Sequence, residues 1–424
     1  MLEQLRLPPV GLALWLGLAA CAGAGPADDP VPEQAAGTPS RQPFTAPDAP
    51  PVPTIRLTQL KIPAPPPRGV PVGASADAAR PIRVCAGGDV MLGNNLDTLW
   101  ARRAAARLGR PVPAHPSPDS LLAPLRPLVA DADIVLFNVE GAVGEGAAPP
   151  KCRPGARNCY AFRQDVEAAL ALRRFAAPAA MVGNIANNHA MDAGLSGFRA
   201  TARNLSLAGV HVTGDDTVAV PVARAGGDTV AFLGFSTSQA GPDPRDLAAV
   251  RRHVARAVTR YGRVVVTAHM GAEGVNAQRT WDATEEYLGE NRGNVVAFAR
   301  AAVDEGAAAV FAHGPHVLRA AEWRGDAVIF YSLGNLLTYG PFSLREPLNR
   351  GAIACVALGH DGRVTEAVLR ATRQVPPGLV SADPTGRAVV LVDSLARLDF
   401  PETRVEWVSQ AVSRPRRRDD GPHR

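Results

Sequence analysis

Residues 82–89, IRVCAGGD, decide how this chain folds. The apolar part of this run is short, contains β-branched residues and lacks a helical period, which predicts a buried strand. Gly87 and Gly88 end the strand and place Asp89 directly behind it. Four more runs of this kind follow along the chain, at DIVLFNV (133–139), AAMVGNI (179–185), RVVVTAH (263–269) and AAVFAH (308–313).

The stretches between these runs have the pattern of amphipathic helices. The clearest are residues 120–130, 165–175, 195–209 and 294–306. Alternating strands and helices predict an α/β fold with parallel strands, helices on the sheet faces and ligands at the carboxyl ends of the strands. Hairpins are expected at 218–236 and 317–335 and two further strands within 350–372, whereas 389–400 fits either a helix or a strand.

Each of the five predicted strands ends in side chains that bind metal ions in proteins. These are Asp89, then Glu140, then Asn187, Asn188 and His189, then His269 and Glu273, and finally His313 and His316. Singly, each has a simpler explanation, because an Asp after two glycines is usually a turn residue and an Asn-Asn-His run is often a loop. Turns and loops do not explain why five successive strands all end in side chains of this kind. Since the carboxyl ends of parallel strands meet at one edge of a sheet, we expect these side chains to share one metal or anion site.

The mixture of carboxylates and imidazoles suits two divalent ions, with Mn, Fe or Zn as candidates. The expected ligands are Asp89, Glu140 and His316 for one ion, and Asn188, His269, His313 and the bridging Glu140 for the other. His189 is expected to act as a general acid that Asp192 orients. Glu273 is either a partner of the ligands or a base on the substrate side. The sequence contains no His-Glu-x-x-His, P-loop or Gly-x-Ser-x-Gly motif that would indicate another chemistry.

The N-terminal residues resemble an export signal. Residues 7–20, LPPVGLALWLGLAA, are too short to span a bilayer, and Leu18-Ala19-Ala20-Cys21 resembles the bacterial lipobox. We therefore expect a lipoprotein signal peptide over 1–21, acylation of Cys21 and an extracytoplasmic, lipid-anchored protein at the cell envelope. The alternatives are an ordinary signal peptide or an uncleaved anchor. Residues 22–80 are rich in Pro and Ala, which predicts a disordered linker.

Charge and composition exclude two classes of protein. The formal net charge is +5, but the last eleven residues alone hold five arginines against two aspartates, and no basic stripe with interleaved aromatic residues indicates nucleic acid. The mean hydropathy of −0.02 excludes a polytopic membrane protein. Residues 376–424 are expected to form a C-terminal extension with an Arg-rich tail.

The five cysteines have different expected roles. Cys85 and Cys355 stand in apolar runs and are expected to be small buried hydrophobic residues. Cys152 and Cys159 flank a loop and could close a short disulfide in an oxidising compartment.

Five blocks of the sequence resemble the CapA family, which is associated with poly-γ-glutamate capsule synthesis and is related to calcineurin-like metallophosphoesterases. The blocks are GGDVMLG (87–93), FNVEG (137–141), GNIANNHAMDAG (183–194), TAHMGAEG (267–274) and AHGPHVLRAAEWRGDAVIFYSLGNLL (312–337). The resemblance runs from about Pro81 to Thr338. It implies a four-layer α/β/β/α sandwich of the metallophosphoesterase type, which we expect to occupy residues 81–375.

The resemblance also concerns single residues. It points to the metal ligands named above and to His189, Glu273 and Glu322. We expect Asn187, Glu322 and Asn335 to bind the substrate. Some positions depart from the related patterns. Met91 stands where phosphoesterases of the Asp-x-His type carry a His ligand, Asn94 and Asn95 stand where an Arg is frequent, and Met270 and Gly274 replace aromatic residues.

Two functions follow from these patterns. The first is a dinuclear-metal-dependent hydrolase or transferase that acts on phosphoester or γ-glutamyl amide bonds. The alternative is a non-catalytic component of a capsule system that binds or exports the polyanion. The expected partners are an anionic polymer such as poly-γ-glutamate or a phosphoester, the membrane through the lipid anchor, and other capsule-synthesis proteins; nucleic acid is not expected.

Overall fold

The computed structural model describes residues 80–96, 98–145, 160–224, 227–407 and 412–413. The predicted signal peptide, Cys21, the linker, the Cys152–Cys159 pair and most of the Arg-rich tail lie outside these residues. Within the described ranges, no helix has the length and apolar character needed to cross a membrane.

The first sheet holds nine of the described strands, in the order β18-β17-β16-β1-β2-β5-β6, with β15 beside β1 and β19 beside β17. β1 is parallel to β2 and β15, and β2, β5 and β6 continue the parallel part of the sheet. The pairs β1–β16, β16–β17, β17–β18 and β17–β19 are antiparallel. Their bounds are β1 (Ile82–Met91), β2 (Ile134–Val139), β5 (Ala180–Asn184), β6 (Val210–Thr213), β15 (Asn335–Thr338), β16 (Arg350–Leu358), β17 (Val364–Val375), β18 (Leu379–Ala382) and β19 (Val412–Ser413).

The second sheet has the order β13-β14-β12-β9-β8-β7 among the described residues. Its four central strands are parallel and its two edge strands are antiparallel. The bounds are β7 (Val220–Ala223), β8 (Thr229–Ser236), β9 (Val264–His269), β12 (Ala309–His313), β13 (Ala321–Arg324) and β14 (Ala327–Phe330). Two short pairs complete the described strands, β3 (Ala142–Val143) with β4 (Arg163–Gln164) and β10 (Glu285–Tyr287) with β11 (Glu290–Gly293).

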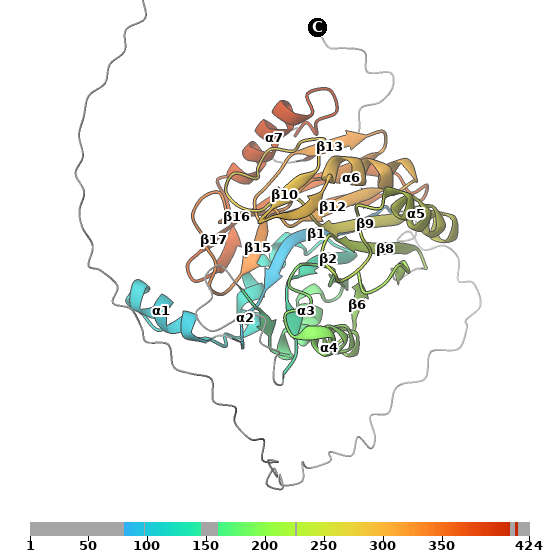
Figure 1. Ribbon diagram of the computed structural model, residues 1–424. Coiled ribbons are helices and arrows are strands. Elements are labelled where there is room, and N and C mark those ends of the chain that lie inside the picture. The colour runs from blue at the N-terminus through green and yellow to red at the C-terminus, as the bar shows by residue number, and fades with distance from the viewer. Residues whose placement is uncertain (1–79, 97, 146–159, 225–226, 408–411, 414–424) are drawn as a thin grey trace, which may run out of the picture. The chain divides into compact units, whose positions relative to one another are not determined.

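Helices cover the outer faces of both sheets (Figure 1). Those on the first sheet are α1 (Leu99–Leu108), α2 (Pro118–Leu122), the 3₁₀ helix η2 (Ala123–Leu128), α3 (Glu167–Ala176) and α4 (Gly194–Leu207); those on the second are α5 (Leu247–Tyr261) and α6 (Val295–Asp304). α7 (Arg387–Asp399) packs along the side of both sheets through Val392 and Leu395.

Strand β1 shows why the sheets stack. Its side chains alternate, so that Cys85 and Val90 enter the apolar core under α1–α4 and Val84 and Ala86 enter the core between the sheets. A strand that is buried on both faces must be apolar throughout, which explains the continuous run in the sequence. A third core lies between the second sheet and α5 and α6. Three cores between layers establish the predicted α/β/β/α sandwich for the part of the chain described.

The predicted elements agree with the structure. The five strands, the two hairpins and the strand pair within 350–372 are confirmed, and 389–400 belongs to helix α7. The expected helix over 120–130 is broken into α2 and η2, because Pro124 and Pro127 lack the N–H that an α-helix needs. β18 and α7, in the predicted extension, contribute Val380 and Val392 to the same cores as the strands before them.

Two expectations were wrong. The five strands do not share one sheet, since β1, β2 and β5 belong to the first sheet and β9 and β12 to the second. Local periodicity predicts a buried strand but does not indicate its partner. Cys85 and Cys355 are not free buried thiols: they stand directly opposite each other in β1 and β16 and form a disulfide across 270 residues of sequence.

This disulfide should contribute to stability. We expect the double variant Cys85→Ala/Cys355→Ala to lower the free energy of unfolding by roughly 2–5 kcal/mol, because the cross-link restricts the unfolded chain. Urea denaturation of oxidised wild type and variant measures the difference. Peptide mapping without reduction provides the check: alkylation of both thiols in the unfolded wild type would contradict the pairing.

Candidate metal centre

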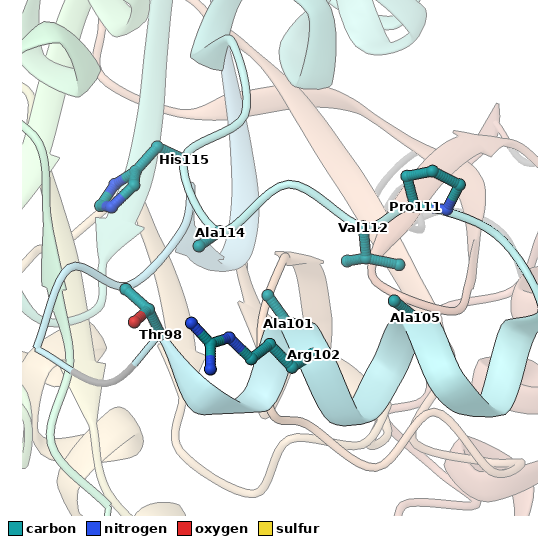
Figure 2. A pocket seen from close by; sticks show the side chains of 8 residues that line it. All are labelled: Thr98, Ala101, Arg102, Ala105, Pro111, Val112, Ala114 and His115. Carbon is teal, nitrogen blue, oxygen red and sulfur yellow. The ribbon is translucent and has the colours of Figure 1, made fainter.

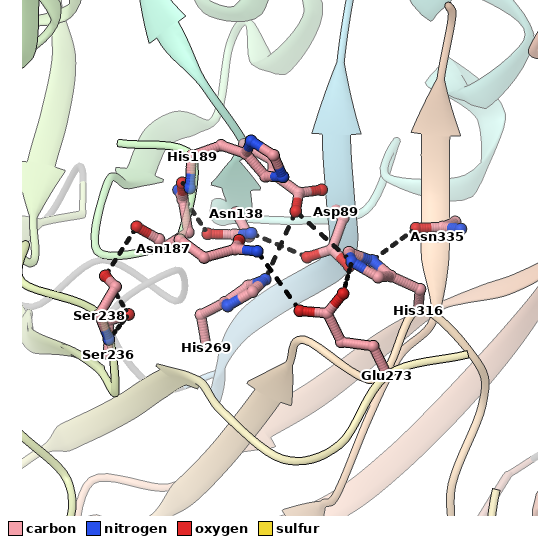
Figure 3. A network of polar contacts seen from close by, with 12 residues as sticks. Asp89, Asn138, Asn187, His189, Ser236, Ser238, His269, Glu273, His316 and Asn335 are labelled. Carbon is pink, nitrogen blue, oxygen red and sulfur yellow. Dashed lines mark hydrogen bonds and ion pairs between the residues drawn. The ribbon is translucent and has the colours of Figure 1, made fainter. Parts of the chain in front are cut away.

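The site forms where the carboxyl ends of strands from both sheets meet. Asp89 is in β1, Glu140 follows β2, His269 ends β9 and His316 follows β12. One ligand atom from each of these four side chains lies within 4.8 Å of all the others. Figure 3 shows Asp89, His269, Glu273 and His316 directed toward one another. The structure thus brings together side chains that are up to 227 residues apart in sequence.

Two glycines allow β1 and β15 to approach each other at this point. A Cβ on Gly88 would lie 1.8 Å from the carbonyl oxygen of Gly334, which no side chain can tolerate. The close approach lets the Asp89 amide donate to that carbonyl oxygen and places Asp89 opposite Asn335. Gly88 is therefore required by the backbone contact that positions Asp89, whereas a Cβ on Gly87 would collide with the side chains of Leu336 and Phe137.

Many buried polar atoms of the site have no hydrogen-bond partner among the described residues. They are both carboxylate oxygens of Glu140, both ring nitrogens of His269, Oδ1 of Asn188 and Nδ1 of His313. A buried polar atom without a partner costs about 1–3 kcal/mol, so a group of them in one place indicates a binding site for an ion. These four residues are the set expected around the second ion, and oxygen and imidazole donors fit Mn, Fe or Zn.

Glu140 has the position of a shared ligand. Its Oε1 lies 3.5 Å from Nε2 of His269 and 3.7 Å from Nε2 of His316. His313 is held by a hydrogen bond of 2.8 Å between its Nε2 and Oγ1 of Thr267, which leaves Nδ1 as the free donor atom. Such a partner fixes the ring of a metal-binding histidine.

His316 is oriented by two acceptors. Its Nδ1 lies 2.9 Å from Oδ2 of Asp89 and 3.0 Å from Oδ1 of Asn335, so Nδ1 carries a hydrogen. Its Nε2 faces Glu140 and Glu273. His316 also has a φ of 59°, in the left-handed region that non-glycine residues rarely adopt. Strain of this kind is found where a side chain must hold one position.

Burial and neighbouring charges shift the pKa of the buried ionisable groups in this cluster. Burial, together with the charge of Asp89, raises the pKa of Glu140 to about 7. Burial lowers the pKa of His269 to about 3 and that of His313 to about 4, so both rings are neutral. Burial opposes a charge on His316, but Glu140 and Asp89 overcome it and raise its pKa to about 10. The proton that His316 carries therefore balances part of the negative charge of the carboxylates.

His189, the expected general acid, lies beside Asp192, the residue expected to orient it. Nδ1 of His189 lies 2.7 Å from Oδ2 of Asp192, and the same carboxylate oxygen accepts the backbone N–H of Phe162. The ring of Phe162 packs against the imidazole at 4.4 Å between centroids. Asp192 thus orients the imidazole of His189, and this geometry is compatible with His189 as a general acid.

The predicted substrate-binding set is mostly engaged elsewhere. Asn187 donates to the carbonyl oxygen of Val139 and accepts from the backbone N–H of His189, so it shapes the loop after β5. Asn335 orients His316. The carboxylate of Glu322 is bound by Arg300, Tyr331 and Thr403, and its hydrogen bonds within the described ranges include no cluster residue. These three side chains already have hydrogen-bond partners within the described residues, and their expected role in substrate binding stays a prediction.

Several residues of the site were missed in the sequence. Asn138 donates to Asp89 and accepts from Asn184, and both amides lie inside the strands β2 and β5. Amides inside otherwise apolar strands were the available signal. Arg319 and Glu285 form a buried pair that holds the loop after β9: Arg319 donates to the carbonyl oxygen of Ala277, and Glu285 accepts the N–H of Ala272.

A second concavity lies away from these residues. An open pocket with a volume of about 480 Å³ lies beside α1. Its lining residues, which Figure 2 labels, include Ala101, Arg102, Ala105, Val112 and His115. None of its lining residues is a member of the cluster, and nothing in its wall resembles a ligand set.

Three comparisons with known proteins bear on the chain. The family model described as bacterial capsule synthesis protein PGA_cap matches residues 83–339. The PGA biosynthesis protein CapA of Bacillus subtilis (strain 168) is 31% identical over 170 residues, which are 36% of this chain and 41% of that protein. The match thus spans less than half the length of that relative.

Solved structures with some likeness include two hydrolases. The calcineurin-like phosphoesterase YfkN from Bacillus subtilis has a TM-score of 0.42 and 9% identity, over 76% of this chain and 97% of that one. The 5′-nucleotidase precursor from Thermus thermophilus has a TM-score of 0.35 and 12% identity, over 75% of this chain and 58% of that one.

Metal affinity should depend on pH. A metal ion must displace the proton of His316, and below pH 7 also that of Glu140. We expect Kd for Mn²⁺ or Zn²⁺ to rise about tenfold per pH unit as pH falls toward 7, and more steeply below it. Calorimetry in buffers of different ionisation enthalpy measures the released protons. His269→Ala should lose binding and the exposed His360→Ala should keep it; a Kd that is constant from pH 6 to 8 would refute the assignment.

The Arg319–Glu285 pair should be essential for stability. Arg319→Ala leaves a buried carboxylate without its partner, and we expect a loss of roughly 3–5 kcal/mol in the free energy of unfolding. The matched control is Arg363→Ala, an exposed arginine paired with Asp326, which should cost less than about 1 kcal/mol. Equal effects of the two substitutions in urea denaturation would show that the pair has no special role.

Proposed function

The chain belongs to the PGA_cap family of bacterial capsule synthesis proteins, and we propose that it is a metal-dependent hydrolase or transferase acting on an anionic envelope polymer. The observation that carries the proposal is the set of buried donor atoms without partners on Glu140, Asn188, His269 and His313. Side chains that are so costly to bury together are expected where a cation compensates them.

The site has one open side. The side chains of Asp89, Glu140 and His269 are at most 1% exposed, whereas His189, His316 and Glu273 keep 12–17% of their surface. A substrate therefore approaches past His189 and Glu273. This arrangement fits a reaction in which the inner residues hold ions and the outer residues handle protons.

The chemistry follows from these two groups of residues. Bound divalent ions would polarise a phosphoryl or carbonyl oxygen and supply a nucleophile at neutral pH. His189, held by Asp192, donates a proton to the leaving group from the open side. Glu273 accepts a proton or orients the attacking group. Because both phosphoesters and γ-glutamyl amides gain from this arrangement, the bond that is cleaved is a matter for experiment.

We further propose that two ions bind unequally. The set of Glu140, Asn188, His269 and His313 supplies four side chains. The other set has Asp89, Glu140 and His316, and Met91 takes the place where related patterns carry a further histidine; Met91 is fully buried. Mn, Fe or Zn would fit either set. The set of Asp89, Glu140 and His316 would then bind its ion weakly. Because catalysis by two ions needs both, this weak binding favours the alternative of a non-catalytic component that binds or exports polyanion.

An extracytoplasmic location is proposed with the function. The lipobox-like Cys21 would anchor the chain to the membrane, where other capsule-synthesis proteins are the expected partners. The Cys85–Cys355 disulfide supports this proposal, since disulfides persist in oxidising compartments.

Activity assays separate the two functions. We expect metal-loaded wild type to hydrolyse bis-nitrophenyl phosphate or poly-γ-glutamate, and a chelator or His269→Ala to abolish turnover. His189→Gln should keep its metal and lower kcat by about 10²–10⁴-fold, as for a lost general acid. Metal content by mass spectrometry controls for ligand loss. Polymer binding without turnover under any of the three metals would favour the non-catalytic component.

A further inference from the structure

Arg292, in β11, places a buried positive charge beside the open side of the metal centre. The residue is 3% exposed. Its Nη2 lies 2.7 Å from Oε1 of Glu273, whose other oxygen lies 3.6 Å from Nε2 of His316. Arg292 was not among the residues expected from the sequence, because it stands in a short hairpin and not at the end of a strand of the main sheets.

The guanidinium of Arg292 has donors to spare. Its Nε and Nη2 are buried without a hydrogen bond from the described residues, although Nη2 is within ion-pair distance of Glu273. The other carboxylate nearby, that of Glu290, lies 3.8 Å from Nη1 and is largely exposed. Arg319 differs: its donors are taken by Glu285 and by carbonyl oxygens. A guanidinium presents a planar fork of N–H groups that matches two oxygens of one anion.

The fold does not need this guanidinium to hold the hairpin. The backbone of Arg292 accepts the N–H of Gly271, and Asn291 accepts a bond of 3.0 Å from Arg245. At the other strand of the hairpin, Glu285 binds Arg319 and the N–H of Ala272. These contacts fix the hairpin against the loop that carries Glu273. The hairpin is thus held without the guanidinium of Arg292, whose close partner is the carboxylate of Glu273.

We propose that Arg292 is the anion-binding residue of the site, receiving a phosphate or carboxylate oxyanion of the substrate next to Glu273. The assignment rests on the proposed function and narrows it to substrates with a negative group beside the bond that reacts. Charge-assisted bonds from a guanidinium fork to an oxyanion are among the strongest in proteins. Glu273 then holds the fork in place until the anion arrives.

The test measures anion binding and metal content separately. The metal-loaded full chain is titrated by calorimetry with inorganic phosphate and, in a second arm, with a short γ-linked glutamate oligomer. We expect Arg292→Gln to weaken binding of at least one probe about tenfold or more and Arg292→Lys to weaken it less, with metal content unchanged. The matched control is Arg251→Gln, a partly exposed arginine of α5 paired with Glu305, which should bind as wild type.

Each outcome decides the question. A loss confined to phosphate or to the oligomer supports the proposal and identifies the oxyanion. Wild-type affinity in Arg292→Gln, no binding of either probe by wild type, or loss of metal together with the anion would overturn it. If Arg292→Gln does not fold, the anion affinity and metal content of Arg292→Lys are compared with those of wild type in its place. If the protein takes up no metal but binds anions through Arg292, the proposed function is refuted and this inference stands. If turnover of wild type and Arg292→Gln is equal, the proposed function stands and this inference is refuted.

Discussion

Repulsion between buried carboxylates is the constraint on which this structure depends. Asp89 and Glu140 are both fully buried, and Glu273 lies at the edge of the same cluster. Burial and the charge of Asp89 raise the pKa of Glu140 to about 7, and the carboxylates in turn raise that of His316 to about 10. The fold therefore holds a concentration of negative charge that a proton balances only in part. A divalent cation would balance it more fully, and the neutral rings of His269 and His313 are ready to share in binding it.

A frame of polar side chains keeps these groups in place at some cost to the core. Asn138 and Asn184 occupy positions inside strands where apolar residues would pack better, and they form a chain of amides that ends on Asp89. Thr267 and Asn335 orient His313 and His316. Ligands held in this way lose little conformational freedom on binding, which is how proteins gain affinity and geometric precision at metal sites.

The family membership and the proposed substrate raise a question of charge at this site. Members of the family serve capsule synthesis, and an anionic polymer needs a site that accepts negative charge despite three carboxylates. Bound cations would supply part of the compensation, and Arg292 would supply the rest from a hairpin anchored to the loop after β9. Related patterns have an arginine near Asn94 and Asn95. In this structure Asn94 donates a hydrogen bond to the carbonyl oxygen of Ala161, and Asn95 is hydrogen-bonded to Arg163 and Asp165.

The sequence by itself determined the strands, most of the helices and the candidate ligand side chains at the strand ends, because hydrophobic period and the residue behind each strand are local properties. The four-layer fold came from the family resemblance. Only the tertiary structure decided that two sheets contribute to the site, that Cys85 meets Cys355, that Asn335 serves His316 and that Glu322 belongs to another network. The positions of Arg292 and of the Arg319–Glu285 pair at the site were likewise visible only in the tertiary structure. Each of these depends on which distant segments become neighbours, and strand order and register arise from packing of the whole chain.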